Sequence, residues 1–490
     1  MSQSTPVSIP VPVPQGTTAV LRPLCVDLDG TLVKSDTLVD SLLVLARSHP
    51  RTLLKLPGQV LRGKAAFKAF VGKSVSLDVV NLPYNRKVLQ YLHQEKARGR
   101  SIYLATGADE QLARRVADHL GIFTGVLASD GATNRTGDRK LESLRERFDC
   151  ADFDYIGNHT PDVPLLAAAT EPMLANPSLS LLLRLKARGI RPVQTFNDRN
   201  SFLRTLLKSL RLHQWSKNLL IFIPLLCSHI VSSGKLLIAL AAFFCFSFTA
   251  SSAYIVNDLL DIDADRRHPR KRLRPFASGE FPAMAGVLLV VMLLASSLIG
   301  GMLLPGHFFA WLLIYLCVTL AYTGVLKRIV LVDVLTLSGL YISRLLAGGS
   351  VTTTQISQWL AGFSLFLFLS LAMAKRFAEL ENLRPTNAVP KNGRGYLLTD
   401  LDQLRSFGTA SAYAAVVVFA IYISGPDVSR LYRHTKVLWL SVPLITLWLN
   451  RVWLLASRGR MDEDPVSFAL TDPMSQMIGL LFVIIVLVAT

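Results

Sequence analysis

A series of long apolar stretches in the C-terminal part of the chain constrains its fold more than any other feature. From about residue 219 onward, nine such stretches follow one another. About 20 apolar residues in a helix cross the roughly 30 Å hydrocarbon core of a bilayer. One stretch alone could be a buried helix of a soluble protein, but nine in succession predict a multi-span, all-α membrane domain. The predicted spans are Leu219–Ser232, Leu236–Val256, Met284–Leu304, Phe308–Leu326, Ile329–Ala347, Trp359–Ala374, Phe407–Ser424, Val437–Ala456 and Met477–Thr490.

The composition is typical of a basic membrane protein. Of 490 residues, 51% are hydrophobic and 18% are charged, and the formal net charge is +18. This apolar content excludes a disordered chain, and so few cysteines exclude a disulfide scaffold. We expect no structural disulfide, because no cysteine lies in a CxxC or Cys/His metal spacing. The cysteines are Cys25, Cys150, Cys227, Cys245 and Cys317.

Lysine and arginine are distributed unequally between the loops that join the predicted spans. The loops after the second, fourth, sixth and eighth spans contain sixteen of them, against four on the other side. Cytoplasmic loops of membrane proteins carry this excess. We therefore expect the basic loops and the N-terminal domain to face the cytoplasm from the cell (inner) membrane. Because the cations gather at membrane-facing loops, a nucleic-acid partner is not expected.

The part of the chain before the spans has the character of a soluble domain. Within residues 21–178, short β-type runs (PLCVDLD, SIYLATG, GVLASDG, FDYIGN and PMLANPS) alternate with charged helical stretches. This pattern favours an α/β, Rossmann-like parallel sheet covered by helices. Residues 1–20 are predicted to be a flexible lead-in and not a signal peptide. Residues 179–216 interleave apolar and basic residues, which predicts a linker and an amphipathic helix on anionic headgroups before a membrane domain at 217–490.

Polar residues that suit phosphate chemistry follow the predicted strands. Asp27 and Asp29 are two residues apart, so strand alternation directs both carboxylates to one side at the strand's end. Such a pair suits Mg²⁺ binding and attack on phosphorus. Thr106 ends a second strand and offers a hydroxyl to phosphoryl oxygens, and Lys140 could neutralise the transferred phosphate. A later strand is followed by a loop with the residues Asn158 and Asp162.

These residues resemble the motifs of the haloacid dehalogenase-like hydrolases, which occur in the same order: DxDGT, a threonine at a strand end, a lysine and a late acidic loop. The resemblance implies that Asp27 is the nucleophile that forms an aspartyl phosphate and that Asp29 is the general acid/base. It implies that Thr106 and Lys140 hold the phosphoryl group. A helical cap is implied at about residues 35–97, and this segment is basic, which suits an anionic substrate or a membrane surface.

One departure from that pattern concerns the metal site. The family's late motif usually begins Gly-Asp, whereas this chain has Gly157-Asn158. An asparagine offers a carbonyl oxygen to Mg²⁺ but lacks the negative charge. Asp27, Asp29, Asn158 and Asp162 are the predicted metal ligands of this weaker site. Two interpretations stay open: a phosphatase with slow turnover, or a non-catalytic docking or regulatory module.

A second group of carboxylates follows the second predicted span. Asp258, Asp261 and Asp265 are spaced i, i+3 and i+7, which places them on one face of a continuous helix. Negative charge concentrated at a membrane edge is costly unless a cation occupies it. Carboxylate oxygens favour Mg²⁺, which in turn holds a diphosphate. Charged residues also lie within or beside the spans, where they are functional candidates. The predicted substrate-binding residues are Lys217, Asn257, Asp265, Lys327, Arg344, Lys375 and Arg376.

The motif NDxxDxxxD at this position resembles the UbiA superfamily of intramembrane prenyltransferases over residues 205–490. The closer match is the decaprenyl-phosphate phosphoribosyltransferase branch, on the segments QWSKN (214–218), VNDLLDIDADRRHPRKRLRPFASG (256–279), YTGVLKRIVLVD (322–333), YISRLLAGG (341–349) and AKRFAEL (374–380). The resemblance implies that phosphoribosyl pyrophosphate and a polyprenyl (decaprenyl) phosphate are the substrates. It assigns Asp258 and Asp261 to catalysis with Mg²⁺.

These observations predict a Mg²⁺-dependent membrane phosphoribosyltransferase that makes a precursor of cell-envelope arabinan. Because the product carries a 5-phosphate, the fused domain is predicted to be the phosphatase that removes it. The alternative is a prenyltransferase that joins a polyprenyl diphosphate to an aromatic or other acceptor, with a regulatory N-terminal domain. Self-association into a homo-oligomer is left open.

Overall fold

The protein consists of two compact units. The computed structural model describes residues 21–130, 135–149, 151–228, 232–384, 394–461 and 465–490, so the predicted lead-in at 1–20 and Cys150 lie outside the described residues. Unit 1 contains the chain up to Ser201 together with Leu260–Ala283, and unit 2 contains Phe202–Leu259 and Met284–Thr490. The two predicted fold classes, a parallel α/β domain and a helical membrane domain, are confirmed.

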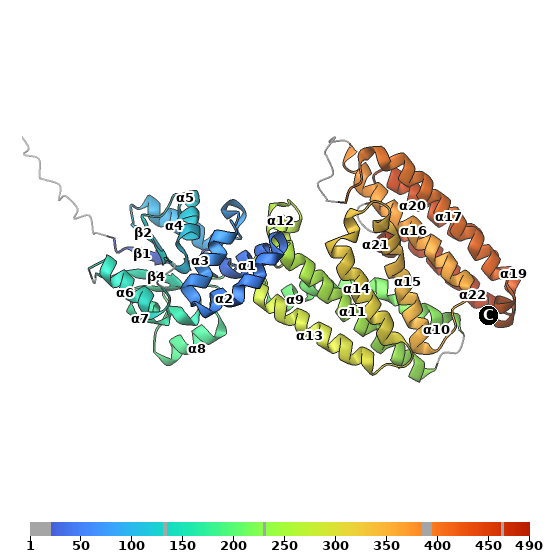
Figure 1. Ribbon diagram of the computed structural model, residues 1–490, viewed down its shortest axis with the longest axis horizontal. Coiled ribbons are helices and arrows are strands. Elements are labelled where there is room, and N and C mark those ends of the chain that lie inside the picture. Colours follow the sequence, from blue (N-terminus) through green and yellow to red (C-terminus); the bar gives the residue numbers. More distant parts are fainter. Residues whose placement is uncertain (1–20, 131–134, 150, 229–231, 385–393, 462–464) are drawn as a thin grey trace, which may run out of the picture. The chain divides into compact units, whose positions relative to one another are not determined.

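Unit 1 is built on a six-stranded parallel sheet in the order β3-β2-β1-β4-β5-β6. Figure 1 labels three of its strands, β1, β2 and β4. The five β-type runs of the sequence form the first five strands. The sixth strand lies in the segment that the sequence predicts as linker. The strands are β1 Leu24–Val26, β2 Ile102–Asp109, β3 Gly125–Ser129, β4 Asp154–Gly157, β5 Pro172–Ala175 and β6 Gln194–Phe196.

Helices cover both faces of this sheet, because alternate residues of a strand point to opposite faces. Leu24 and Val26 of β1 join the core under α4 (Arg86–Ala97) and α5 (Glu110–Leu120). Cys25 joins the core on the other face, under α6 (Asp138–Arg147), α7 (Val163–Ala168) and α8 (Leu179–Ala187). The sheet domain therefore continues beyond residue 178, and α8 packs as one of its helices through Leu181 and Leu185.

A helical cap is inserted between β1 and α4. It comprises α1 (Thr37–Ser48), the 3₁₀ turn η1 (Pro50–Lys55), α2 (Leu56–Leu61), α3 (Lys64–Ser74) and η2 (Val79–Asn81). Asp36 caps α1 by accepting hydrogen bonds from the backbone N–H groups of Leu38 and Val39. The predicted cap ran to residue 97, whereas α4 belongs to the helix layer on the sheet, with Val88 and Leu92 in the core.

The basic loop after the first long membrane helix is part of unit 1. It contains α12 (Ile262–Arg267) and η5 (Lys271–Leu273). Arg266 is buried and forms an ion pair with Asp40 of α1 at 2.8 Å and a hydrogen bond to Ser35 at 3.1 Å. A buried carboxylate needs such a partner, because desolvation of an unpaired charge is costly. This loop is therefore tied to the cap by a buried ion pair.

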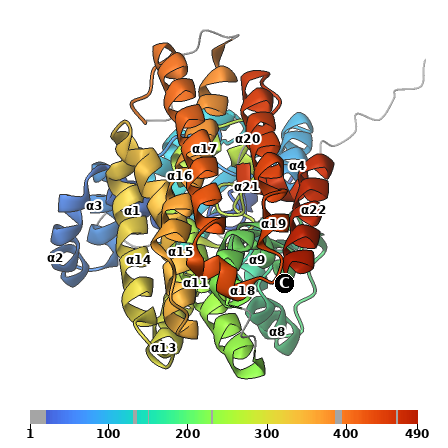
Figure 2. The same ribbon diagram turned by 90° about the vertical axis from the view of Figure 1, so that its right-hand side faces the viewer.

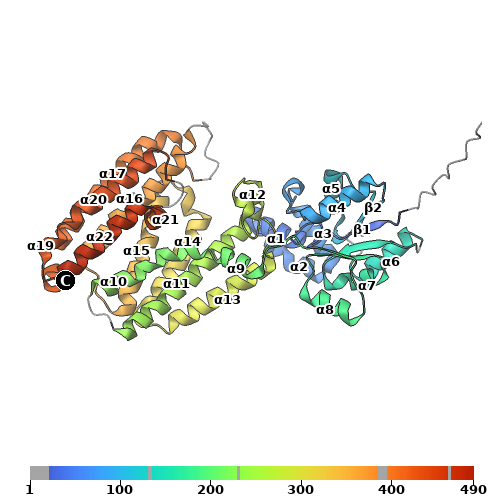
Figure 3. The ribbon, with the colours of Figure 1, turned by 180° about the vertical axis from the view of Figure 1, so that it is seen from behind.

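Unit 2 is a bundle of apolar helices. Within the part of the chain that the structure describes, six of them are long and apolar enough to cross a membrane, and α14 (Phe308–Gly324) and α22 (Pro473–Ala489) are shorter apolar helices. α15, α16 and α17 pack side by side (Figure 2 and Figure 3). The six are α11 Ser233–Leu260, α13 Ala283–Met302, α15 Val332–Thr352, α16 Gln358–Glu381, the segment Leu398–Ile423 that includes α17 (Leu401–Ile423), and the segment Thr435–Ser457 that includes α20 (Ser441–Ser457).

The predicted count of nine spans is not confirmed, because two predicted spans correspond to the shorter helices α14 and α22, and the first is not a long α-helix. Its residues up to Cys227 lie in η4 (Leu212–Phe222), a 3₁₀ helix, and in the five-residue α10 (Ile223–Cys227), and its residues 229–231 lie outside the described residues. Pro224 lacks an N–H group, so it cannot extend the hydrogen-bond ladder from the preceding turn. η4 packs closely on α15 at Gly348, where a Cβ atom would lie 2.1 Å from the carbonyl oxygen of Ile221.

Candidate active sites

The predicted residues of the sheet domain meet at the carboxyl ends of its central strands. Asp27 and Asp29 follow β1, Thr106 lies in β2, and Asn158 follows β4. β1 pairs with both β2 and β4, so these three strand ends are neighbours. The direction of strand order changes between β1 and β4, which is where open α/β sheets bind ligands.

Asp27 and Lys140 form the centre of this site. The Nζ atom of Lys140 lies 2.8 Å from Oδ1 of Asp27, and both side chains are buried. Burial raises the pKa of Asp27 to about 6, against the opposing effect of the Lys140 charge. The carboxylate is therefore ionised at neutral pH, as a nucleophile must be.

Asp29 has the opposite protonation preference. Its Oδ1 atom accepts a hydrogen bond from the backbone N–H of Thr37 at 2.8 Å. Burial, together with the charges of Asp36 and Asp27, raises its pKa to about 8. Two neighbouring carboxyl groups whose environments separate their pKa values define an acid and a base. Asp29 is thus protonated at neutral pH and able to donate a proton.

Asp162 is a hydrogen-bonding centre of the loop after β4. Its Oδ1 atom accepts from the Tyr155 hydroxyl at 2.9 Å and from Lys140 at 3.4 Å. Its Oδ2 atom accepts from the backbone N–H groups of Asn158 and His159, both at 3.1 Å. With both oxygens engaged, Asp162 orients the loop and Lys140, an arrangement that disfavours its predicted role as a metal ligand. Nothing in the sequence pattern singled out Tyr155, which completes this network.

Asn158 is the buried side chain of this site that lacks hydrogen-bond partners. It is buried, and neither its Oδ1 nor its Nδ2 atom has a hydrogen-bond partner. Buried polar groups in proteins are nearly always paired, so an unpartnered carboxamide calls for a ligand. It lies against Gly30, where a Cβ atom would approach Nδ2 to 1.9 Å, so only glycine fits there. A hard oxygen beside Asp27 and Asp29 fits Mg²⁺.

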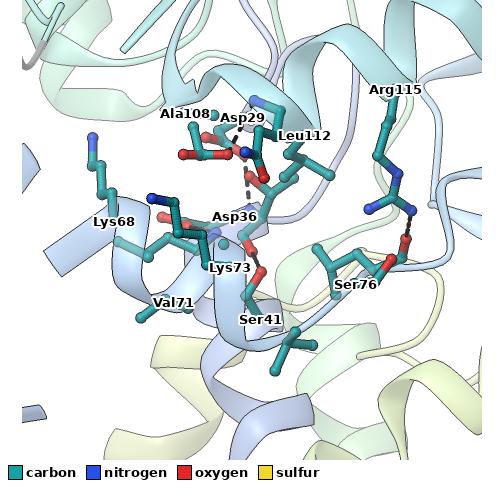
Figure 4. Close-up of a pocket in the computed structure, with 17 residues that line it drawn as sticks. Asp29, Asp36, Ser41, Lys68, Val71, Lys73, Ser76, Ala108, Leu112 and Arg115 are labelled. Atoms are coloured by element: carbon teal, nitrogen blue, oxygen red, sulfur yellow. Dashed lines mark hydrogen bonds between the residues drawn. The ribbon is translucent and has the colours of Figure 1, made fainter. Parts of the chain in front are cut away.

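A cavity of about 360 Å³ opens beside Asp29, between the cap and the sheet domain (Figure 4). Lys68 and Lys73 of α3 line it, and Arg115 of α5 lies at its other side. Lys68 donates a hydrogen bond to the carbonyl oxygen of Gly107 at 2.7 Å. Burial lowers the pKa of Lys68. Asp36 and Asp109 line the same cavity, so carboxylates offset part of the charge of its three cations.

The three aspartates of the membrane motif do not form one cluster. α11 ends at Leu260 and α12 begins at Ile262, so the continuous helix that would align Asp258, Asp261 and Asp265 is interrupted. Asp258 pairs with Arg211 at 2.5 Å, Asp261 with Arg47, and Asp265 with Arg274 at 2.7 Å.

This pairing bears on the predicted metal site of the membrane domain. Among the described residues, no group of three or more His, Cys, Asp or Glu side chains is placed to hold a metal ion. The arrangement of the three aspartates therefore does not fit a bound Mg²⁺ as it stands, and their metal-binding role stays a prediction. Arg211, which no motif indicated, has a left-handed backbone conformation (φ +52°) and lies over the ring of Tyr254.

A buried ionic network joins α14, α15 and α16. Arg376 contacts Asp333 at 2.5 Å, the Tyr322 hydroxyl at 2.9 Å and Glu379 at 2.8 Å. Arg394 also contacts Glu379. All three nitrogens of the Arg376 guanidinium donate to protein groups, which disfavours its predicted role in holding a substrate phosphate. Tyr322 was outside the predicted site residues because a tyrosine beside an apolar span carries no distinctive signal.

Arg344 lies deeper in α15, in a second polar cluster. Its Nε atom donates to Asn218 at 2.7 Å, and its Nη2 atom donates to the Tyr315 hydroxyl at 3.0 Å. Lys217, the neighbour of Asn218, lies over the ring of Tyr341. The structure thus brings the QWSKN segment and Arg344 together, as hydrogen-bonded partners inside the bundle. Asn257, Lys327 and Lys375 are half-buried.

An apolar helical bundle with candidate membrane spans, joined to a parallel α/β domain, defines an integral membrane protein with a fused second domain. The chain belongs to the UbiA prenyltransferase family, whose model matches residues 221–475. A protein of Sinorhizobium fredii, described as uncharacterized protein y4nM, is 36% identical over 94% of this chain and 89% of its own length.

Two further comparisons concern the membrane domain alone. The decaprenyl-phosphate phosphoribosyltransferase of Mycobacterium tuberculosis is 30% identical over 56% of this chain and 91% of its own length. Among solved structures, a UbiA homolog from Archaeoglobus fulgidus bound to GPP and Mg²⁺ is 17% identical, covers 57% of this chain and 96% of its own, and has a TM-score of 0.44.

Proposed function

We propose that the membrane domain transfers 5-phosphoribose from phosphoribosyl pyrophosphate to a polyprenyl (decaprenyl) phosphate. The observation that carries this proposal is the 30% identity to a decaprenyl-phosphate phosphoribosyltransferase over 91% of that protein's length. In this reaction an oxygen of the lipid phosphate attacks the anomeric carbon. The bond from that carbon to the diphosphate breaks, and the diphosphate leaves. The lipid phosphate is already an anion, so the attack needs no general base.

The main task of such a site is to place anions beside one another. The apolar helices provide the environment for the lipid tail, and buried or half-buried lysines of the bundle are suited to hold phosphates. We assign this role to Lys217, Lys327 and Lys375. Arg344 and Arg376, whose donors are engaged by the protein, would keep the helices in position. Mg²⁺ dependence is part of the proposal.

Transfer of label from radiolabelled phosphoribosyl pyrophosphate to polyprenyl phosphate tests this function in reconstituted membranes. Asp258→Asn is expected to reduce transfer at least tenfold, because it removes the negative charge opposite Arg211. Asp402→Asn, at an exposed position of α17, is the matched control and should transfer normally. Chelation of Mg²⁺ should stop the reaction. Absence of transfer, with a prenyl diphosphate joined to an aromatic acceptor instead, would establish the rival prenyltransferase.

We further propose that the sheet domain hydrolyses the 5-phosphate of the transferred group. Asp27 attacks phosphorus, Asp29 protonates the departing ribose oxygen, and the resulting aspartyl phosphate is hydrolysed by water from which Asp29 takes a proton. Lys140 holds the charge of the phosphoryl group. Asp27 and Asn158 would hold Mg²⁺, whose charge offsets repulsion between carboxylate and phosphate, whereas the protonated Asp29 side chain serves as the acid. The product, a polyprenyl-phosphoryl ribose, would serve cell-envelope arabinan synthesis.

Mass spectrometry of the lipid products tests the phosphatase. The wild-type chain should release a lipid without the 5-phosphate, whereas Asp27→Asn should accumulate the phosphorylated lipid. Glu142→Gln, on the exposed side of α6, should behave as the wild type. An equal 5-phosphate content in all three would show that the domain is a non-catalytic module.

A further inference from the structure

The middle of the cap is a surface with no core beneath it. η1 and α2 follow one another from Pro50 to Leu61, and neither contains a buried residue. Leu54 and Leu61 expose 84% and 90% of their surface, and Val60 exposes 58%. Single exposed apolar residues are ordinary, but a gathering of them on consecutive turns marks an interaction surface. This segment is therefore built to be covered.

The charge of the same segment limits what can cover it. Between Asp40 and Asp78 the chain has no acidic residue and seven basic ones. Four of these, on η1, beside α2 and at the start of α3, are exposed next to the apolar residues: Arg51, Lys55, Arg62 and Lys64. Apolar side chains ringed by cations without a single carboxylate match a bilayer of anionic lipid, in which acyl chains lie beneath negative headgroups.

The cap holds this surface in place. α1 and α3 flank the segment and are anchored by Leu45 and Val71, which are fully buried. Gly63 (φ +106°) makes the turn from α2 into α3, a backbone conformation that glycine adopts most readily. No atom lies within 4 Å of a Cβ built at Gly58 or Gly63, so this edge is open. The apolar residues are thus presented on a fixed scaffold.

We propose that the cap binds the surface of an anionic phospholipid bilayer through Leu54, Val60 and Leu61, with Arg51, Lys55, Arg62 and Lys64 on the headgroups. We call these seven residues the cap lipid face. A bilayer is the occupant that the chain itself supplies, because unit 2 holds the protein in a membrane and keeps that surface at high effective concentration. The inference does not depend on which reaction either unit performs.

Site-specific photo-crosslinking in the full-length chain tests this proposal. A benzophenone amino acid replaces Leu54 or Leu61 in separate variants, and each is reconstituted into vesicles that contain an alkyne-tagged phosphatidylglycerol. We expect lipid adducts at both positions, at least fivefold above those from the same probe at Val80. Val80 is the matched control, since it is 63% exposed on η2 of the same domain but lies close to Asp78, whose carboxylate pairs with Arg267.

Two changes test whether the adducts depend on attraction between the cations and anionic headgroups. Replacing the anionic lipid by phosphatidylcholine that carries the same tag, or introducing Arg62→Glu together with Lys64→Glu, should lower the adducts at Leu61 severalfold. All altered positions are exposed, so the fold should persist, and thermal unfolding of each variant verifies this. Lipid adducts at Leu54 and Leu61 no greater than those at Val80 would overturn the proposal. So would adducts to protein, whether a second copy or another chain.

Discussion

At the scale of single residues, the candidate site of the sheet domain and that of the membrane domain differ in whether their aspartates are paired with arginine. In the sheet domain, the carboxyls of Asp27 and Asp29 have raised pKa values and remain available for chemistry. In the membrane domain, Asp258 and Asp333 are neutralised by Arg211 and Arg376. A buried ion pair balances desolvation against attraction, and removing one partner leaves an uncompensated charge. The first arrangement suits proton transfer, and the second suits a framework that keeps helices in register.

Lys68 should cause substrate binding by the phosphatase to weaken at a lower alkaline pH than an ordinary lysine would. Its pKa is lowered chiefly by burial, against the charges of Asp29 and Asp36, and Lys140 and Lys64 lower it further. A lysine binds phosphate while protonated, so this contribution is present below its pKa and is lost as the pH rises through it. The KM for ribose 5-phosphate should therefore rise at a lower pH than it would if the site contained a lysine of ordinary pKa. The KM should increase by about tenfold or more, since a charge-assisted hydrogen bond contributes about 1.5–3 kcal/mol.

Lys68→Arg provides the comparison, because arginine stays protonated throughout. Its KM should be flat over the pH range in which the wild-type value rises, and Lys73→Arg, at an exposed position of α3, should leave the wild-type profile unchanged. A KM profile that is the same for Lys68→Arg and the wild type would remove Lys68 from substrate binding.

The catalytic residues of the sheet domain could be predicted because their chemistry is local in sequence. Asp27 and Asp29 adjoin one strand, and the alternation of a strand fixes their common side. Tyr155 and Arg211 could not be found in this way. Tyr155 acts through Asp162 and Lys140, and Arg211 meets Asp258 from 47 residues away. Such partners are set by tertiary packing, which no spacing in the chain encodes.

At the scale of elements, strands and long apolar helices were predictable, whereas interruptions were not. The predicted helix through Asp258, Asp261 and Asp265 ends at Leu260, because the following loop joins the cap through Arg266. The first predicted span becomes a 3₁₀ segment packed on α15. In both places long-range packing overrides the local pattern, which is the usual limit of reasoning from periodicity.

Gly348 is expected to be essential for the packing of η4 on α15. A methyl group there would lie 2.1 Å from the carbonyl oxygen of Ile221, so Gly348→Ala must move one backbone away from the other. Overpacking of this kind costs about 1–3 kcal/mol. Thermal unfolding of the purified protein in detergent should show a lower midpoint for this variant.

Gly339→Ala is the control within the same helix, since nothing lies within 4 Å of its added methyl group. That substitution should leave the midpoint unchanged or raise it, because alanine favours a helix over glycine by about 1 kcal/mol. Equal midpoints for both variants would show that η4 does not pack against Gly348 as described.

At the scale of the whole molecule, the chain path constrains the membrane topology. Unit 1 contains residues that precede and residues that follow the segment 202–259 in the chain, because Leu260–Ala283 belongs to it together with the sheet domain. A single compact unit lies on one side of a membrane. The segment 202–259 must then cross an even number of times, and α11 accounts for one crossing. η4 and α10 together have 16 residues. At about 2.0 Å rise per 3₁₀ residue and 1.5 Å per α residue, they reach roughly 30 Å, enough for the other crossing.

Cysteine accessibility in intact cells tests this path. A cysteine in place of Lys235, at the exposed start of α11, should react with a membrane-impermeant maleimide added outside, and one in place of Arg272 should react only after the membrane is opened. The parent chain with Cys317→Ser gives the background, because Cys317 is an exposed native cysteine. If both positions label from the same side, neither α11 nor the segment formed by η4 and α10 crosses the membrane, and the proposed pair of crossings is wrong. If they label from opposite sides with Arg272 inside, both the sheet domain and the basic loops face the cytoplasm, where phosphoribosyl pyrophosphate would be available to the membrane domain.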